Sequence, residues 1–276
     1  MNFKQICKAI KEVKIQGAEN IAQAAAKALL LRHNKAAVKK LLSLRPTEPC
    51  LRNTIRFVLS FSDIKEGVET ALDHFKDSDK KIQEYGSKKI ESGMTIFTHC
   101  HSSAVISVLR KAKAQGKRFQ VYATETRPLF QGRKTAIELA KAGIPVTLFV
   151  DSAARVALKK ADLFLFGADA ITAESKVINK IGTELFAEVA KRYDISAYSC
   201  TDSWKFDPRS VFGFKEPIEM REAAEIWPNH PKKVKIANPA FERVSPEVIT
   251  GIISELGVFP PALFVDEVRN RYSWLK

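Results

Sequence analysis

The first part of the chain carries hydrophobic side chains at the three- and four-residue spacing of amphipathic helices. In the first segment these positions are Ile6, Ala9, Ile10 and Val13. A turn or helix start follows at Gly17-Ala18-Glu19-Asn20, and the alanine- and leucine-rich run IAQAAAKALLL after it strongly favours a helix. Further helical patterns cover residues 36–44, 51–59 and 64–90. The sequence Arg45-Pro46-Thr47-Glu48-Pro49 interrupts them, because proline blocks helix continuation. We therefore expect an α-helical N-terminal domain over residues 1–90.

From Gly93 onward, short apolar runs alternate with amphipathic segments. The apolar runs are Met94–Phe97, Phe119–Ala123, Pro145–Val150, Leu163–Phe166 and Ile195–Cys200. Helical patterns such as Thr135–Lys141 and Ser152–Lys159 lie between them. Alternating strands and helices predict a parallel sheet with helices on both faces, and continuous apolar runs are typical of strands buried on both sides. The expected fold class is α/β, with a parallel-sheet domain over residues 91–276.

Two later segments lack this alternation. The proline- and charge-rich stretch from Phe206 to Lys235 predicts a long loop, and long loops in compact domains are often functional. The tail, Phe259–Lys276, docks either on the core or on a partner, and its apolar sequence VFPPALFV suits both.

The stretch Met94–Ser107 combines a strand, a polar turn and a helix start. The turn is Thr98-His99-Cys100-His101-Ser102-Ser103, and a helical pattern follows it. Open α/β sheets bind ligands at such strand ends, and the free N–H groups of the helix start suit a phosphate. A low thiol pKa is physically plausible for Cys100 in this turn. The alternative is that Cys100 is a small buried hydrophobic residue.

Polar clusters follow four of the expected strands. They are the Cys100 turn, Thr124–Pro128 with Gln131-Gly132-Arg133, Gly167-Ala168-Asp169, and Thr201–Lys205. Because the ends of parallel strands meet along one edge, a thiol, a carboxylate, an arginine and a lysine are expected to converge there. Each has a simpler alternative: Asp169 caps the next segment, Arg127 pairs with Glu125, and Lys205 is a surface lysine.

The amino-acid composition shows that the chain is strongly basic. The 276 residues include 45 Lys+Arg against 31 Asp+Glu, a net charge of +14, which favours anionic partners. The basic residues are dispersed, without a stripe interleaved with aromatic residues, so direct nucleic-acid binding is disfavoured. Four cysteines without metal-ligand spacing indicate a reduced, cytoplasmic protein. We expect no signal peptide, no membrane span, no metal and no cofactor.

Longer motifs resemble a known family. GADAITAESKVINKIGT, THCHSS, ETRPLFQG and the late NPAFE are similar to the alpha, beta and delta subunits of translation initiation factor 2B. That family also contains methylthioribose-1-phosphate isomerase and archaeal ribose-1,5-bisphosphate isomerase. The resemblance covers nearly the whole chain and implies a helical N-terminal domain followed by a Rossmann-like domain. It also implies an archaeal origin and dimers or larger assemblies through the C-terminal domain.

In the isomerase branch, a cysteine and an aspartate form the catalytic pair, and they correspond to Cys100 and Asp169. The reaction converts an aldose phosphate into a ketose phosphate by moving a hydrogen from C2 to C1. A thiol and a carboxyl group in a water-poor pocket are suited to serve as acid and base. The implied substrate-binding residues are Gly17, Ala18, Arg45, Ser102, Ser103, Asn179, Lys180 and Lys205, and we expect Arg127 of the second polar cluster to join them.

One departure from the isomerases concerns an Arg-Gly-Ala motif near the N-terminus, which reads Gln16-Gly17-Ala18 here. Glutamine lacks the charged, bidentate fork that arginine offers to phosphate. A milder departure is Glu242, which replaces an aspartate of many members. On the other side, the regulatory subunits usually lack the cysteine that this chain retains.

Two functions follow from this split. The first, which we expect, is an initiation factor 2B-type subunit that binds a sister subunit or initiation factor 2, most directly the alpha subunit of that factor. Its pocket for a sugar phosphate or nucleotide would be regulatory or vestigial. The alternative is a sugar-phosphate isomerase that uses Cys100 and Asp169. A protein that only senses such ligands is a third reading. In each case we expect a homo-oligomer, most simply a dimer.

Overall fold

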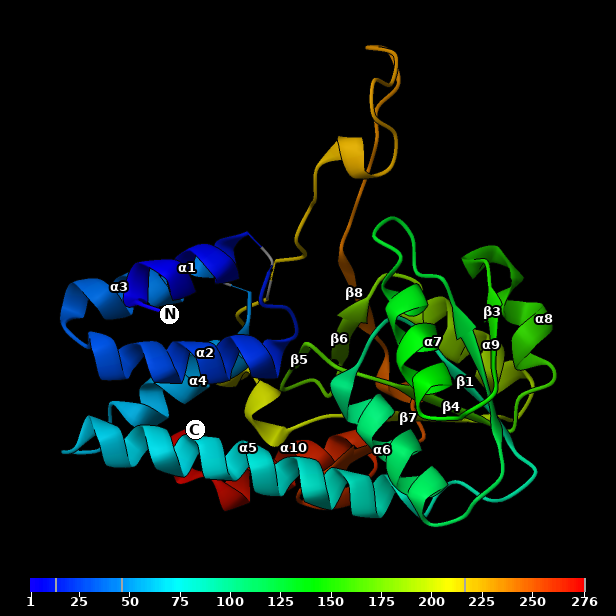
Figure 1. The fold of residues 1–276 in the computed structure, drawn as a ribbon, viewed down its shortest axis with the longest axis horizontal. Coiled ribbons are helices and arrows are strands. Elements are labelled where there is room, and N and C mark those ends of the chain that lie inside the picture. The colour runs from blue at the N-terminus through cyan, green and yellow to red at the C-terminus, as the bar shows by residue number, and fades with distance from the viewer. Residues whose placement is uncertain (13, 46, 216, 276) are drawn as a thin grey trace.

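The computed structural model describes residues 1–12, 14–45, 47–215 and 217–275, so Val13 and Pro46 of the predicted patterns lie outside the described residues. The first part of the chain folds into helices that lie beside a sheet domain (Figure 1). These helices are α1 (Phe3–Lys11), α2 (Ala18–Leu31), α3 (Lys35–Leu44), α4 (Pro49–Val58) and α5 (Ile64–Ser87). The expected helical character of this region is confirmed.

The helix ends follow local sequence signals. Gly17 takes a positive φ of 86° as the N-cap of α2, a conformation that glycine adopts without strain. Pro49 begins α4 at the first helical position, where its missing N–H removes no hydrogen bond. The last helix, α5, ends at Ser87 instead of Ile90, and the first strand begins at Thr95. A domain boundary near residue 90 remains our proposal.

The second part is built on a seven-stranded sheet. In chain order its strands are β1 (Thr95–Thr98), β2 (Gln120–Thr124), β3 (Val146–Phe149), β4 (Leu163–Phe166), β7 (Ser196–Cys200), β9 (Gly251–Ser254) and β10 (Gly257–Phe259). The spatial order is β10-β9-β7-β4-β1-β2-β3, and every neighbouring pair is parallel except β9 with β10. The expected α/β class with a parallel sheet is confirmed.

Helices cover both faces of this sheet (Figure 1). They are α6 (Ser103–Ala114), α7 (Gln131–Lys141), α8 (Ala154–Leu158), α9 (Thr183–Arg192) and α10 (Pro261–Arg271). The two faces are evident in β1, where Ile96 joins a core with α6 and α7 while Phe97 joins the core that includes α8 and α9. Both side chains are fully buried, as expected for a strand covered on both sides.

A second, antiparallel sheet and a projecting arm were not predicted. The small sheet has the order β5-β6-β8 and contains β5 (Ala170–Ile171), β6 (Val177–Lys180) and β8 (Phe241–Val244). The chain before β8 leaves the body as an extended arm, coloured yellow to orange in Figure 1. Its two legs pair where the amide of Arg221 donates to the Asn238 carbonyl (2.9 Å) and the amide of Ala240 to that of Glu219 (2.8 Å). The arm replaces part of the loop expected over 206–235.

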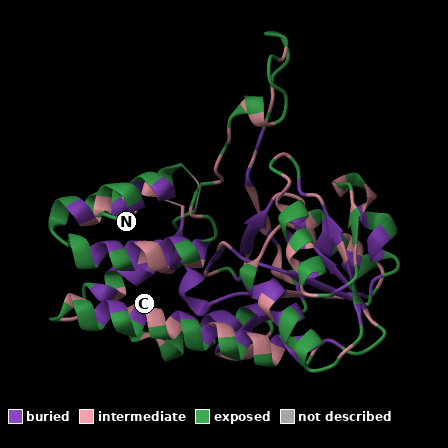
Figure 2. Ribbon diagram, viewed as in Figure 1, coloured by how far each residue is buried: buried purple, intermediate pink, exposed green. Residues whose placement is uncertain are grey.

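The C-terminal tail docks on its own subunit. Phe264, Val265 and Val268 of α10 are buried in the core, so much of VFPPALFV packs within the chain. Figure 2 shows the same contrast across the fold, with buried strands inside the sheet domain and exposed outer faces on the helices. No described helix is both long enough and apolar enough to cross a membrane.

Candidate active site

A cleft opens where the sheet changes winding direction. From β1 the chain proceeds outward to β2 and β3 on one side, and later to β4, β7 and β9 on the other. The loops after β1 and β4 therefore diverge and leave a crevice at the carboxyl ends of the strands, the position at which open α/β sheets bind ligands. The cleft measures about 200 Å³ and is closed on one side by the helical region.

Ten of the eleven predicted site residues line this cleft. They are Gly17, Ala18, Arg45, Cys100, Ser102, Ser103, Asp169, Asn179, Lys180 and Lys205. Arg127 is the exception: its side chain is exposed and its Nη2 reaches the carbonyl oxygen of Ile226 in the arm, at 3.3 Å. The structure therefore does not bring Arg127 to the cleft with the other ten, because the turn after β2 directs its side chain outward. Gln16 does line the cleft, so the departure noted in the sequence falls within the site.

Cys100 is held in an unusual backbone conformation at the end of β1. Its φ of 67° lies in the left-handed region, which costs free energy for a residue with a side chain. Two hydrogen bonds stabilise it: the Cys100 amide donates to Thr126 Oγ1 (3.0 Å), and its carbonyl accepts from Thr135 Oγ1 (2.8 Å). Burial raises the pKa of the thiol to about 11, although Lys180 acts in the opposite direction. The expected low thiol pKa is therefore wrong, because burial outweighs the neighbouring charge, and Cys100 is a protonated thiol.

Asp169 follows β4 and faces the same cleft. Its amide donates to the carbonyl of Ile178 in β6 at 2.8 Å, which fixes the backbone. Burial raises the pKa of this carboxyl, while the charges of Lys205, Lys180 and Arg45 oppose the rise. A protonated thiol and a carboxyl with a raised pKa are an appropriate proton donor and acceptor for acid–base chemistry near neutral pH.

Two buried lysines bring positive charge to the cleft. Lys180 ends β6 and is 8% exposed, with its Nζ 4.8 Å from the ring centre of Phe241. Lys205 is 9% exposed, and its Nζ donates to the carbonyl of Ala168 at 2.7 Å. Among the described residues, neither has a carboxylate within ion-pair distance. Burying an unpaired cation is costly, so both positions favour an anionic ligand.

The start of α6 supplies a second anion-binding feature. Ser102 is the N-cap, and its hydroxyl accepts a bond from the Val105 amide at 3.4 Å. Gly167, after β4, lies so close that an added Cβ would be 2.7 Å from Ser102 Oγ. Only glycine allows these two loops to approach in this way. The first-turn N–H groups of α6, with Ser103 as its first residue, then border the cleft.

The turn before Cys100 is fixed by a neutral histidine. His99 is buried; its Nε2 donates to the carbonyl of Ile181 (2.9 Å) and its Nδ1 lies 2.6 Å from Thr124 Oγ1. Burial lowers the pKa of His99 to about 4, so it carries no charge at neutral pH. Its function is to hold the strand end.

Several residues that line the cleft were not predicted as site residues from the sequence. Glu48, His101, Lys134, Glu219 and Arg221 all border the cleft. Glu48 lies in the same short segment as the predicted site residue Arg45, so a charged residue at this position could have been predicted to border the cleft. Glu219 and Arg221 come from the base of the arm, and no sequence pattern indicated that this loop returns to the site.

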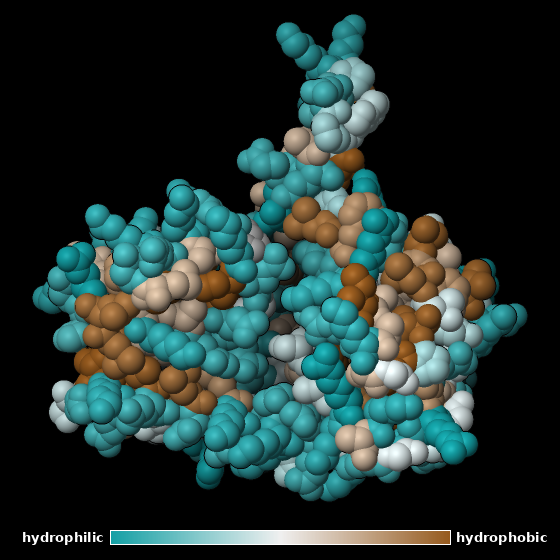
Figure 3. Space-filling view, viewed as in Figure 1, coloured by the Kyte–Doolittle hydropathy of each residue, from teal (hydrophilic) through white to brown (hydrophobic). Residues whose placement is uncertain are grey.

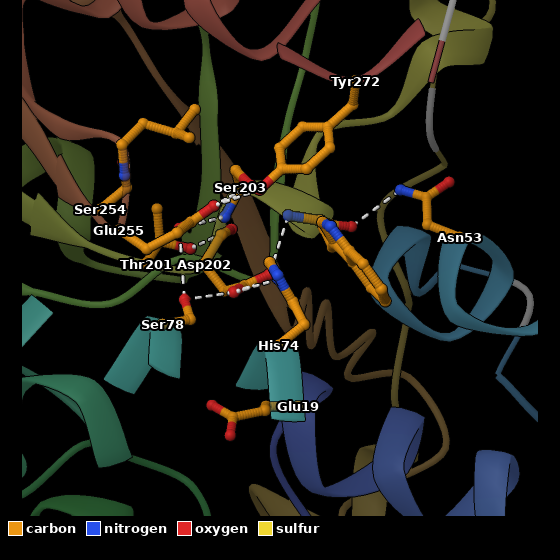
Figure 4. A network of polar contacts seen from close by, with 12 residues as sticks. Glu19, Asn53, His74, Ser78, Thr201, Asp202, Ser203, Ser254, Glu255 and Tyr272 are labelled. Carbon is orange, nitrogen blue, oxygen red and sulfur yellow. Dashed lines mark hydrogen bonds and ion pairs between the residues drawn. The ribbon is translucent and has the colours of Figure 1, made fainter. Parts of the chain in front are cut away.

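A buried polar network connects the helical region to the turn after β7, and Figure 4 shows His74, Ser78, Asp202 and Glu255 within it. His74 of α5 lies 2.9 Å from Asp202 Oδ2, and Ser78 Oγ donates to the same carboxylate. Asp202 caps the turn η2 (Ser203–Lys205) by accepting from the Trp204 amide at 2.8 Å. This turn carries Lys205, so α5 helps to fix the cation in the cleft.

The same network contains metal-ligand types. His74, Asp202 and Glu255 have ligand atoms within 4.8 Å of one another. The Glu255 carboxylate, however, already accepts bonds from the Ser203 amide (3.1 Å), the Tyr272 hydroxyl (3.1 Å) and the hydroxyls of Ser203 and Ser78. Hydrogen bonds therefore account for this cluster without an ion.

The fold and the cleft define a Rossmann-like α/β protein with a helical cap and a cleft that contains a thiol, a carboxyl group and two buried lysines. The chain matches the initiation factor 2 subunit family over residues 4–261 and belongs to that family. The resemblance drawn from the sequence motifs is confirmed.

Curated relatives separate the two functional readings. The chain is 39% identical to ribose 1,5-bisphosphate isomerase of Thermococcus kodakarensis, over 98% of this chain and 94% of that protein. It is 35% identical to methylthioribose-1-phosphate isomerase of Thermosipho melanesiensis, over 94% and 87%. A solved structure described as translation initiation factor eIF-2B of Pyrococcus horikoshii superposes with a TM-score of 0.86 at 26% identity, over 95% of this chain and 98% of that one.

These relatives overturn the expected function. We expected an initiation factor 2B-type subunit, but the curated relatives of higher identity are named as isomerases. Gln16 misled the interpretation, because one missing arginine was weighted above the thiol and carboxyl pair that the chain retains. A complex with initiation factor 2 or its alpha subunit was part of the same expectation and has no support from the names of these relatives.

Proposed function

We propose that this protein is a sugar-phosphate isomerase that converts an aldose phosphate into a ketose phosphate. The observation that supports this most strongly is the cleft itself. A protonated thiol and a carboxyl group face it from β1 and β4, together with two buried lysines that lack a carboxylate partner among the described residues. Relatives named as ribose 1,5-bisphosphate isomerase make that compound the first substrate to test.

In this proposal the charged groups bind the phosphates. Lys180 and Lys205 offer buried positive charge, and the N-terminal turn of α6 offers N–H groups beside Ser102 and Ser103. An anionic ligand would offset the desolvation of both lysines. Asn179, next to Lys180 in β6, donates from Nδ2 to Thr183 Oγ1 at 3.0 Å, so its amide oxygen is available to a sugar hydroxyl.

The helical region completes the binding site from the opposite side. Gly17 and Ala18 begin α2 at the cleft wall, and Arg45 borders it from the end of α3. Arg45 Nη2 lies 3.2 Å from Glu48 Oε1 and 3.7 Å from Glu219 Oε2. The contact with Glu219 joins the helical region to the base of the arm. These contacts support the proposal that the helical region excludes water from the reacting carbons.

Cys100 and Asp169 then share the proton chemistry. Asp169 accepts the proton from C2 as the base, because its raised pKa makes the carboxylate a stronger base than a solvated one. The Cys100 thiol, which keeps its proton at neutral pH, donates to C1. The C2 hydroxyl becomes the ketone, and its proton passes to the oxygen released from C1, while the proton held by Asp169 returns to Cys100 through solvent before the next turnover. The net result is the movement of one hydrogen from C2 to C1, with no change in overall oxidation state.

A direct test is product analysis. The purified protein is incubated with ribose 1,5-bisphosphate and, separately, with methylthioribose 1-phosphate, and the ketose carbonyl is sought by ¹³C NMR. Formation of a ketose from either compound supports the proposal. Recovery of both unchanged, under conditions in which the protein binds them, rejects it.

We also propose that the protein forms a homo-oligomer, as expected from the sequence. Hydrophobic side chains gather over β3 and α8 (Figure 3), where the edge strand β3 leaves Leu148 42% exposed and α8 leaves Val156 61% exposed. A second copy of the chain would cover this face. Sedimentation of wild type and of Leu148→Glu tests it: the variant should have the lower mass, and equal masses would contradict the proposal.

A further inference from the structure

Glu48 is a buried carboxyl group in the wall of the cleft. The residue precedes α4, is 3% exposed and borders the same cleft as Asp169. One of its oxygens, Oε1, accepts a bond from Arg45 Nη2 at 3.2 Å. The other, Oε2, is buried and has no hydrogen-bond partner within the described part of the chain. An ionised carboxylate with one oxygen left unsatisfied in this way would be costly.

The charges around Glu48 come from several elements. Asp169 lies after β4, Lys205 is in η2, Arg45 follows α3, and Glu219 is at the base of the arm. Burial is the largest influence and the charge of Asp169 is the next, and together they raise the pKa of Glu48 to about 7 against the opposing effects of Arg45 and Lys205. The nearby charge of Asp169 therefore favours the protonated form of Glu48.

The protonation state of Glu48 changes the charge of a site that attracts anions. When the carboxyl is neutral, the lysines act on a phosphorylated ligand without a negative charge at Glu48. When Glu48 is ionised, it adds a negative charge to the buried wall beside Asp169, where charge repulsion is strong. We propose that Glu48 sets the pH range in which this cleft accepts a phosphorylated ligand: the neutral acid permits binding and the carboxylate expels it. This inference rests on the sugar-phosphate function proposed above.

The size of the effect follows from proton linkage. If a ligand binds only the form with neutral Glu48, its affinity falls by about tenfold between pH 6 and pH 8 for an ionisation centred near 7. The phosphates of the ligand also ionise in this range. Their effect is the same for every protein variant, so a ratio of affinities between two variants removes it.

The matched variant is Glu48→Gln, which keeps the shape and an oxygen for Arg45 but never ionises. Binding of ribose 1,5-bisphosphate is measured by calorimetry at pH 6, 7 and 8 in a Cys100→Ser background, which prevents turnover. We expect the affinity of the protein with Glu48, relative to Glu48→Gln, to fall about tenfold from pH 6 to pH 8. A ratio that stays within about twofold over this range overturns the inference and leaves the proposed function intact.

A second measurement needs no ligand. In protein labelled with ¹³C at glutamate carboxyls, a signal that titrates near pH 7 should vanish in Glu48→Gln and persist in Glu19→Gln. Glu19 is the appropriate control, because it also borders the cleft and burial raises its pKa to about 7. If no signal that titrates above pH 6 is lost in Glu48→Gln, the inference is wrong. If the signal is present but no sugar phosphate binds or is converted, the proposed function fails and the inference fails with it.

Discussion

His74 Nε2 lies 2.9 Å from Asp202 Oδ2, and this contact joins α5 of the helical region to the turn that carries Lys205. The ring of His74 also stacks on Trp204, with centroids 3.9 Å apart. Asn53 of α4 donates to the carbonyls of Trp204 (2.7 Å) and Phe206 (2.8 Å) from the other side. The helical region therefore holds a cation of the cleft through buried polar contacts.

Replacing His74 should destabilise the protein. His74→Ala leaves the buried carboxylate of Asp202 without its charged partner, a change that typically lowers the free energy of unfolding by roughly 3–5 kcal/mol. Urea denaturation of wild type and variant measures the difference. His33→Ala, at an exposed position on the helical region, is the control and should change stability little. If both variants lose the same free energy of unfolding, the contact between His74 and Asp202 does not stabilise the protein in the way predicted.

The same pair predicts how stability depends on pH. Burial opposes the charged form of His74, but Asp202 and Glu255 outweigh it and the pKa of His74 is raised. Burial alone would raise the pKa of Asp202. The charge of His74 and hydrogen bonds from Ser78 and the Trp204 amide outweigh burial, so the pKa of Asp202 is lowered. The histidine's contribution is complete below its ordinary pKa of about 6.5 and is lost as pH rises through the raised value. The aspartate's contribution is complete above about 4 and is lost as pH falls through the lowered value.

The stability difference between wild type and His74→Ala should therefore be largest between about pH 4 and pH 6.5 and should decrease on both sides. Denaturant titrations at pH steps across this range give the curve directly. A difference that grows steadily towards high pH would show that His74 is neutral in the native state.

Lys180 offers a test that separates binding from folding. Lys180→Met removes a buried cation that has no ion pair in the described chain, and replaces it with an apolar side chain of similar length. We expect the free energy of unfolding to stay the same or rise, while affinity for a sugar phosphate falls roughly tenfold to hundredfold. Lys160→Met, at an exposed position, should change neither quantity. Loss of stability without loss of affinity would indicate a structural role.

Gln16 lies in the cleft wall, so restoring the family's arginine should strengthen ligand binding. One charge-assisted contact is typically worth about 1.5–3 kcal/mol, or roughly a tenfold to hundredfold gain in affinity or catalytic efficiency. Steady-state kinetics of Gln16→Arg measures the gain, and Gln115→Arg at an exposed helix end controls for the added charge. Equal behaviour of the two variants would mean that position 16 does not face the phosphate.

The sequence was most informative where the signal is local. Apolar runs identified β1 and β4, and the polar residues after them proved to face one cleft because parallel strands end at one edge. Hydrophobic spacing likewise found α1 to α5 with small errors at their ends. Gly17, Arg45 and Asn179 came from the family motifs, because no hydrophobic periodicity marks such positions.

The rest depends on contacts between distant segments. The strand β5 has only two residues and β8 mixes apolar with charged side chains, so they form a sheet only because β6 lies between them. The arm brings Glu219 and Arg221 back to the cleft through backbone pairing that no sequence pattern marks. The high thiol pKa of Cys100 was missed for a related reason: burial is a property of the assembled fold.

Turnover of ribose 1,5-bisphosphate, followed by ¹³C NMR in wild type, Cys100→Ser and Asp169→Asn, tests the central claim most directly. Cys7→Ser, at a buried cysteine of α1, is the matched control for the loss of a thiol. The account predicts ketose formation by wild type and Cys7→Ser, and a loss of roughly a hundredfold to ten-thousandfold in each cleft variant, the range typical of a missing acid or base. If Cys100→Ser and Asp169→Asn both form the ketose at the wild-type rate, the account is contradicted.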